Sequence, residues 1–161
     1  MNCRKKKIWA VLAVFWMIVI FCFSHQKADD SGALSGSITY RIVEAVDVLF
    51  DLELSEKERL VYAKEIEHPI RKAAHMTEYG IFACILLGNF MQYPFFYKRR
   101  YLFAEAGAVL YAATDEFHQR FVEGRSGELR DVCIDSTGAL IGLLLAWVFL
   151  SLYKRKIERN S

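Results

Sequence analysis

Three short motifs place histidines, acids and bases at spacings that bring side chains together on a helix. They read Arg71-Lys72-x-x-His75-x-x-Glu78-Tyr79, Asp115-Glu116-x-His118-Gln119 and Asp131-x-x-x-Asp135. Residues three or four apart lie on the same helical face. The first motif therefore predicts a shared face for Lys72, His75 and Glu78. The second predicts a shared face for Asp115, His118 and Gln119, with Glu116 pointing about 100° away.

These residue types suit acid–base chemistry on a charged substrate. A histidine beside a carboxylate can move protons, and a basic side chain can hold a phosphate or a carboxylate. Ser24 and Gln26, at the end of the first apolar stretch, are expected to meet the same cluster. The candidate catalytic residues are His75, Glu78, Asp115, Glu116 and His118, and the candidate substrate-binding residues are Lys72, Gln119, Arg125, Ser24 and Gln26.

The same motifs also allow a divalent metal ion as an unidentified cofactor. Both His75-x-x-Glu78 and Asp115-x-x-His118 place two potential ligands one helical turn apart, although neither is a His-Glu-x-x-His sequence. The plainer alternative is a structural network of ion pairs between the acids and Lys72, Arg71, Arg125 and the histidines. The candidate metal ligands are His75, His118, Asp115, Asp131 and Asp135.

Four apolar stretches are long enough to carry these motifs across a bilayer as helices. They are Ile8–Phe23, Ile70–Met91, Tyr101–Phe117 and Val132–Tyr153, and each has roughly the length of a transmembrane helix. The sequence thus predicts an all-α membrane protein with four transmembrane helices. An ionised side chain at mid-membrane costs about 2.5–3.5 kcal/mol, so the polar groups must pair, bind an ion or line a wet cavity.

Opposite charges gather on opposite sides of these four stretches. Residues Ser24–Glu78 and Thr114–Asp135 hold ten Lys/Arg and seventeen Asp/Glu, a net charge of −7. The remainder holds eleven Lys/Arg and two Asp/Glu, a net charge of +9. By the positive-inside rule both termini are cytoplasmic. This topology puts every histidine at or beyond the outer ends of the helices.

The only long connection, residues 24–69, is predicted to form an extracytoplasmic insert between the first two spans. Asp29–Ser37, with its glycines and serines, suggests a turn or flexible stretch. Apolar residues from Ile38 to Phe50 recur at helical spacing and predict an amphipathic helix on the membrane surface. Ser55-x-x-Glu58 is a capping box that opens a short second helix, and His68-Pro69 is expected to break it before the next span.

Composition narrows the class of protein further. The 161 residues fit one domain, 1–161, and 54% of them are hydrophobic. There is no basic stripe with interleaved aromatic residues, so we expect no nucleic-acid partner. None of the four cysteines lies in the outer insert, and no extracellular disulfide framework is expected. No small-x-small cleavage site follows the first stretch, which we therefore interpret as an uncleaved span.

The motifs together resemble the VanZ-like membrane protein family. The resemblance runs through Phe23–Gln26, Arg71–Tyr79, Ala113–Arg125 and Asp131–Ala139, nearly the whole chain apart from the insert Ser31–Glu67. One departure is Glu123, where proline is common before Gly-Arg. The resemblance implies a multi-pass protein of the bacterial cytoplasmic membrane. The named member of the family is associated with low-level resistance to the glycopeptide antibiotic teicoplanin, but the family implies no particular reaction.

Three classes of function stay open from the sequence, and it does not decide whether the protein is an enzyme. The first is a cell-envelope protein whose outward site binds or modifies an anionic lipid, a lipid-linked cell-wall precursor or a lipophilic glycopeptide. The second is a membrane-embedded, metal-dependent hydrolase or transferase, with His75 or His118 as general base. The third is a small transporter or proton relay. Few polar residues lie in the inner halves of the spans, which favours a one-sided pocket over a path through the membrane.

Overall fold

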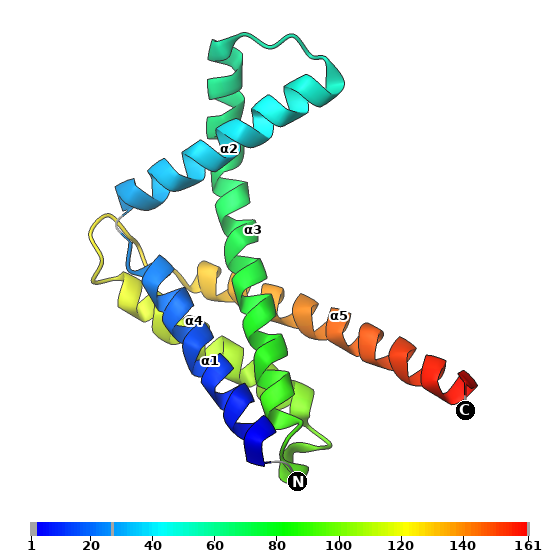
Figure 1. Ribbon diagram of the computed structural model, residues 1–161. Helices are drawn as coiled ribbons and strands as arrows, with labels where there is room; N and C mark the ends of the chain where they lie inside the picture. Colours follow the sequence, from blue (N-terminus) through cyan, green and yellow to red (C-terminus); the bar gives the residue numbers. More distant parts are fainter. Residues whose placement is uncertain (1–2, 27, 161) are drawn as a thin grey trace.

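The regular structure is helical (Figure 1). The computed structural model describes residues 3–26 and 28–160, and for residues 28–31 it describes only the backbone. No strand occurs within these ranges. The predicted all-α class is confirmed. The elements are α1 (Cys3–Ser24), α2 (Ala28–Phe50), α3 (Glu56–Phe90), the short 3-10 helix η1 (Pro94–Phe96), α4 (Arg100–Gln119) and α5 (Leu129–Asn160).

The long helix α3 is the central element of the fold. It packs against each of the other α-helices: α1, α4 and α5 contact it toward its C-terminal half, and α2 crosses it near its N-terminal end. Figure 1 shows α1, α4 and the lower part of α3 running side by side, with α5 crossing α3 and then diverging toward the C-terminus. Packing against a shared partner fixes the three polar motifs relative to one another.

The sequence prediction of a break at His68-Pro69 is wrong. The capping box is present as expected, because Ser55 Oγ accepts from the Glu58 N–H and the Glu58 side chain accepts from the Ser55 N–H. The helix that starts there continues through Pro69 to Phe90. Proline removes one backbone hydrogen bond, but α2 packs against the chain before it and α5 against the chain after it. Tertiary contacts on both sides therefore keep the helix continuous.

The predicted turn at Asp29–Ser37 is also helical, since α2 starts at Ala28. A stripe of small and polar side chains one turn apart on α2 is buried. Asp47 pairs with Arg59 of α3 at 2.7 Å and accepts a hydrogen bond from the Leu54 N–H. Ser35 donates to Glu67 of α3 at 2.8 Å. These contacts with α3 cannot be inferred from local helix propensity. They stabilise α2 as a continuous helix through its glycines. The buried stripe consists of Ser35, Thr39, Val43 and Asp47.

The apolar stripe of α2 does not face α3. Its side chains lie beside the buried stripe and remain substantially exposed, as do several apolar residues around the turn into α3. An amphipathic helix with an open apolar face is typical of one that lies on a membrane surface. The position of α2 on a membrane stays a prediction. The exposed apolar residues of α2 include Leu34, Ile38, Ile42 and Val46.

A core of small and aromatic side chains joins α1, α3, α4 and α5. Ala104, Ala108 and Ala112 form a fully buried stripe on α4, which lets the neighbouring helices approach closely. Two side chains of this core reach the backbone of another helix. Trp16 Nε1 of α1 donates to the Glu78 carbonyl of α3 at 3.0 Å, and Tyr111 OH of α4 donates to the Met17 carbonyl of α1 at 2.6 Å.

The crossing of α3 and α5 depends on glycine. A Cβ atom at Gly138 would overlap the backbone of Met76, and one at Gly142 would lie 2.5 Å from the Gly80 carbonyl oxygen. On α3, a Cβ at Gly80 would lie 3.0 Å from the Gly138 oxygen. The spacing Gly138-x-x-x-Gly142 is typical of close helix packing, and the two helices pack closely at this crossing.

Two of the four expected spans meet a length and hydropathy criterion for crossing a membrane. These are α1 and α5. The other two expected spans, within α3 and α4, carry more charged residues. The count of four transmembrane helices and the N-in/C-in topology therefore remain predictions.

We predict that Gly138→Ala destabilises the protein. The added methyl group meets the α3 backbone at Met76, which cannot move aside as a side chain would, and overpacking of this kind costs about 1–3 kcal/mol. Gly36→Ala is the matched control, because nothing lies within 4 Å of a Cβ built there. Thermal unfolding in detergent should show a lower melting temperature for Gly138→Ala alone. Equal melting temperatures would contradict the close crossing.

We also predict that Asp47→Ala loosens α2 from α3. Loss of the carboxylate leaves Arg59 without its ion pair and the Leu54 N–H without its acceptor, at a cost of about 1–3 kcal/mol. Limited proteolysis between residues 50 and 56 should accelerate. Glu44→Ala, an exposed acid one turn earlier on α2, should leave the cleavage rate unchanged. If both variants were cleaved at the wild-type rate, the ion pair would have no role in holding α2.

Candidate functional site

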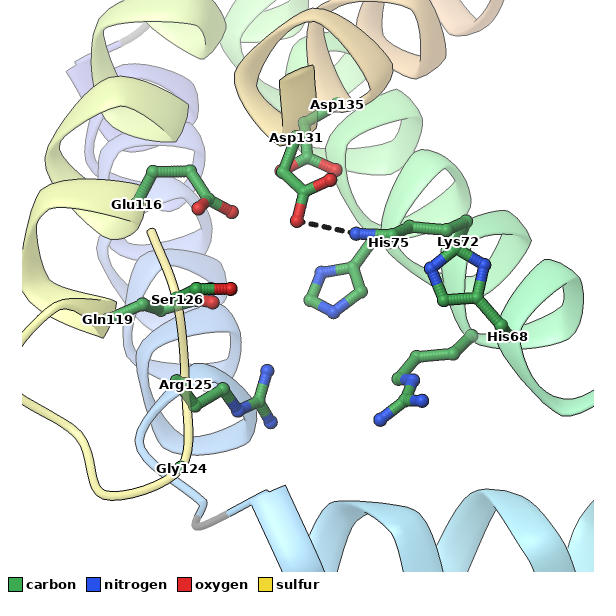
Figure 2. A pocket seen from close by; sticks show the side chains of 11 residues that line it. His68, Lys72, His75, Glu116, Gln119, Gly124, Arg125, Ser126, Asp131 and Asp135 are labelled. Atoms are coloured by element: carbon green, nitrogen blue, oxygen red, sulfur yellow. Dashed lines mark ion pairs between the residues drawn. The ribbon is translucent and has the colours of Figure 1, made fainter. Parts of the chain in front are cut away.

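A polar pocket lies between α3, the C-terminal end of α4, the N-terminal end of α5 and the loop that joins α4 to α5 (Figure 2). Its volume is about 160 Å³. All three polar motifs of the sequence contribute to its wall. The lining residues are His68, Arg71, Lys72, His75, Glu116, Gln119, Gly124, Arg125, Ser126, Asp131 and Asp135.

The loop between α4 and α5 is fixed by its own backbone contacts. Gly124 has a φ of 76°, a left-handed conformation that favours glycine. Gly127 lies against the end of α4, where any Cβ would overlap the Glu116 carbonyl oxygen. The Glu116 carboxylate accepts from the Glu128 N–H at 3.0 Å. The loop is therefore held close to α4, and it presents Arg125 to the pocket.

Two arginines, Arg71 of α3 and Arg125 of the loop, line the pocket, and Figure 2 shows the Arg125 guanidinium pointing into it. Arg125 Nε donates to the Gln26 carbonyl at 3.1 Å, so the loop is tied to the chain just after α1. Arg71, on the opposite wall, pairs with Glu67 at 3.5 Å. Burial and then the nearby Arg71 charge lower the pKa of the Arg125 guanidinium. Two like charges held this close favour an anion between them.

Carboxylates occupy the other end of the pocket (Figure 2). Lys72 Nζ on α3 pairs with Asp131 on α5 at 2.5 Å. Glu116 and Asp135 are both buried, and within the described residues neither forms an ion pair. The pocket is thus bipolar, with arginines at one end and acids at the other.

A second polar cluster lies behind the pocket. Asp115 is buried and accepts from Gln119 Nε2 at 3.3 Å. The hydroxyl groups of Ser24 and Tyr79 interact with the same carboxylate. Within the described part of the chain, Ser24 Oγ, Tyr79 OH and Asp115 Oδ1 have no well-formed hydrogen bond. Asp115 therefore joins α1, α3 and α4 from inside the bundle and does not line the pocket.

His75 lies between the two ends of the pocket (Figure 2). Its Nδ1 atom is 3.8 Å from a carboxylate oxygen of Glu78, one turn further along α3. Glu78 does not line the pocket, so it contacts the site through the histidine. A histidine between a carboxylate and an open pocket has the geometry of a group that can accept or donate a proton.

The other candidate histidine lies elsewhere. His118 Nε2 is 3.1 Å from His25 Nδ1, and both rings pack against Phe21 of α1. Glu116 and Gln119, not His118, extend from α4 into the pocket. His118 does not line the pocket, because α4 packs against both α1 and α5 and presents His118 to α1; a catalytic role for His118 stays a prediction.

The structure thus sorts the predicted site residues into three groups. One group lines the pocket, a second lies behind it, and a third is separate. Gln26 contributes only its backbone carbonyl, through Arg125. The pocket group is Lys72, His75, Glu116, Gln119, Arg125, Asp131 and Asp135; the group behind is Ser24, Glu78 and Asp115; His118 is separate.

Sequence reasoning named Arg71 only as a partner of the acids and gave no site role to His68 or Ser126; all three line the pocket. His68 and Arg71 precede Lys72 and His75 at helical spacings of three and four, so a continuous helix through Pro69 places all four on one face. The expected break at Pro69 hid the place of His68 in that pattern. Ser126 follows Arg125 in the loop and carries no comparable pattern.

The positions of the potential ligands bear on whether the pocket can bind a metal ion. Among the residues that the structure describes, no group of three or more His, Cys, Asp or Glu side chains is placed to hold a metal ion. The candidate ligand His118 is on the α1 side of α4, and Asp115 is behind the pocket. A metal site at the remaining candidates, His75, Asp131 and Asp135, stays a prediction.

Of the comparisons with known proteins, the one with models of protein families gives a match, and that match agrees with the resemblance. No curated protein sequence and no solved structure matches the chain. The sequence model of the VanZ/LLP1 family matches residues 9–150, a range that includes most of α1, the insert, the pocket and most of α5. The chain therefore belongs to the VanZ/LLP1 family.

Proposed function

We propose that the chain crosses the bacterial cytoplasmic membrane four times, with both termini in the cytoplasm. The two apolar helices α1 and α5 support this topology, as does the net charge of +9 on the terminal side. At 1.5 Å per residue the 35 residues of α3 span about 50 Å, more than the roughly 30 Å hydrocarbon core. The N-terminal part of α3 therefore extends beyond the bilayer together with α2, and the pocket lies near the outer surface.

We propose that this pocket binds the anionic headgroup of an envelope lipid or of a lipid-linked cell-wall precursor. The observation that carries the proposal is that Arg71 and Arg125 both line the pocket, near enough for their charges to interact. Arginine binds phosphate and carboxylate through paired N–H donors. A site for such a precursor accounts for a link to glycopeptide susceptibility, since altered handling of the precursor changes the antibiotic's target.

An enzyme is the second candidate, supported by His75 at the centre of the pocket. With Glu78 at 3.8 Å and Asp131 near, His75 would act as general base in hydrolysis or transfer at the bound headgroup. A divalent metal would supply an activated water. A transporter or proton relay has less support, because the pocket is lined from the outer ends of the helices alone.

We predict the side of the membrane from which cysteines placed in two of the loops can be labelled. With the native cysteines replaced, an impermeant maleimide should label Glu123→Cys in intact cells. It should label Lys98→Cys, in the turn between α3 and α4, only after permeabilisation. This pattern follows from the charge distribution. Labelling of Lys98→Cys in intact cells would reverse the topology and move the pocket to the cytoplasmic side.

We predict that Arg125→Gln weakens binding of a fluorescent short-chain phosphatidic acid by about ten-fold or more, the loss expected for one hydrogen-bonded charge. Fluorescence anisotropy of the detergent-purified protein measures this. Arg130→Gln, an exposed arginine five residues later that does not line the pocket, should bind like wild type. Circular dichroism checks that both variants fold. Equal weakening by both would mean that net charge, not the pocket, attracts the lipid.

A further inference from the structure

We infer that the pocket takes an amine-bearing phosphate, with the phosphate held between Arg71 and Arg125 and the ammonium group beside Glu116 and Asp135. The inference rests on the proposed function, because it keeps the anion where that proposal puts it. It adds a positively charged amine as the group at the other end of the ligand.

The arginine end fits a phosphate better than a carboxylate. Each guanidinium presents several N–H donors in a planar fork. Arg125 uses Nε for the Gln26 carbonyl, which leaves its terminal nitrogens to face the pocket (Figure 2). A carboxylate has two coplanar oxygens, which one fork saturates, whereas the tetrahedral phosphate directs its charged oxygens to different sides, so that each can accept from a different guanidinium. Two guanidinium groups in one pocket are therefore matched to a phosphate between them.

The acidic end calls for a positive charge on the ligand. Asp131 already has Lys72 as its counter-charge. Asp135 is 2% exposed and Glu116 is 5% exposed. Within the described residues neither forms an ion pair, and the single charge of Lys72, paired with Asp131, is shared with both. Buried carboxylates without a full counter-charge are costly. A ligand that carried only negative charge would add repulsion at this end. An ammonium group would offset one of the two negative charges and could donate hydrogen bonds to both carboxylates.

The size and shape of the pocket limit the ligand to a headgroup. Its volume of about 160 Å³ is below the roughly 300–1,000 Å³ of sites that enclose a drug-sized molecule. Arg125 and the acids lie at opposite ends of this space, with His75 and Gln119 between them (Figure 2). A phosphate and an amine separated by two carbons suit a pocket of this small volume, while longer parts of a lipid would remain outside.

The test compares two ligands that differ only in the amine. Dihexanoyl phosphatidylethanolamine and dihexanoyl phosphatidylpropanol have the same phosphate and chains, and a methyl group replaces the ammonium in the second. Each displaces the fluorescent phosphatidic acid from purified protein in the presence of EDTA. We expect the amine lipid to bind about ten-fold more tightly to wild type. The variants Asp135→Asn and Glu116→Gln should remove that difference while they leave phosphatidylpropanol bound.

The outcomes separate this inference from the proposed function. If both lipids bind wild type equally and Arg125→Gln weakens both, the anion site stands and the amine preference is overturned. If neither lipid binds, the proposed function fails as well. If Mg²⁺ in place of EDTA raises phosphatidylpropanol binding to the level of the amine lipid, the acids hold a metal ion and the amine inference is wrong.

Soluble phosphoethanolamine distinguishes the source of the headgroup. The same preference over propyl phosphate is expected if the pocket recognises the headgroup alone. Competition by phosphoethanolamine at concentrations similar to those of the lipid would assign the site to a free metabolite. Competition only at much higher concentrations would assign it to a membrane lipid. Both results support the amine-bearing phosphate, and a preference for propyl phosphate would overturn it.

Discussion

The close crossing of α3 and α5 is the constraint on which the rest of the structure depends. Gly138 and Gly142 let the α5 backbone touch that of α3 at Met76 and Gly80. One turn before Gly138, Asp135 enters the pocket, and one turn earlier Asp131 reaches Lys72. If the helices were held further apart, as ordinary side chains would require, the ion pair would open and the acidic end of the pocket would lose its wall.

Several polar side chains within the bundle form hydrogen bonds with the backbone of a neighbouring helix. Trp16, Tyr111 and Cys84 all donate to backbone carbonyls on a different helix. Such a bond requires a particular residue on only one of the two helices, because every residue has a backbone carbonyl. It fixes how far one helix is shifted along the other. The acids that line the pocket behave differently, since Glu116 and Asp135 are buried and form no ion pair within the described part of the chain. That imbalance separates the pocket from the helix-fastening contacts around it.

Much of the fold could be predicted from the sequence, because apolar length, capping and small-residue spacing are local properties. The helical class, the Ser55 cap and the glycine crossing all follow from such patterns. The continuity of α3 through Pro69 and of α2 through Asp29–Ser37 could not, since contacts between α2 and α3 override the local preference. The site was predicted in composition but not in orientation. A helical wheel relates Glu116 to His118, yet only the positions of α1 and α5 decide which of them faces the pocket.

The hydrogen bond that holds Arg125 also connects the pocket to the segment between α1 and α2. Its guanidinium bonds the Gln26 carbonyl, and Gln26 stands between the end of α1 and the start of α2. The terminal nitrogens of the same guanidinium face the pocket, beside the Nε atom that holds Gln26. Because α2 is also attached to α3 through Asp47–Arg59 and Ser35–Glu67, and Glu67 pairs with Arg71, both arginines of the pocket are connected to α2. The two arginines of the pocket are therefore each connected to the start of the insert, Arg125 through Gln26 and Arg71 through Glu67.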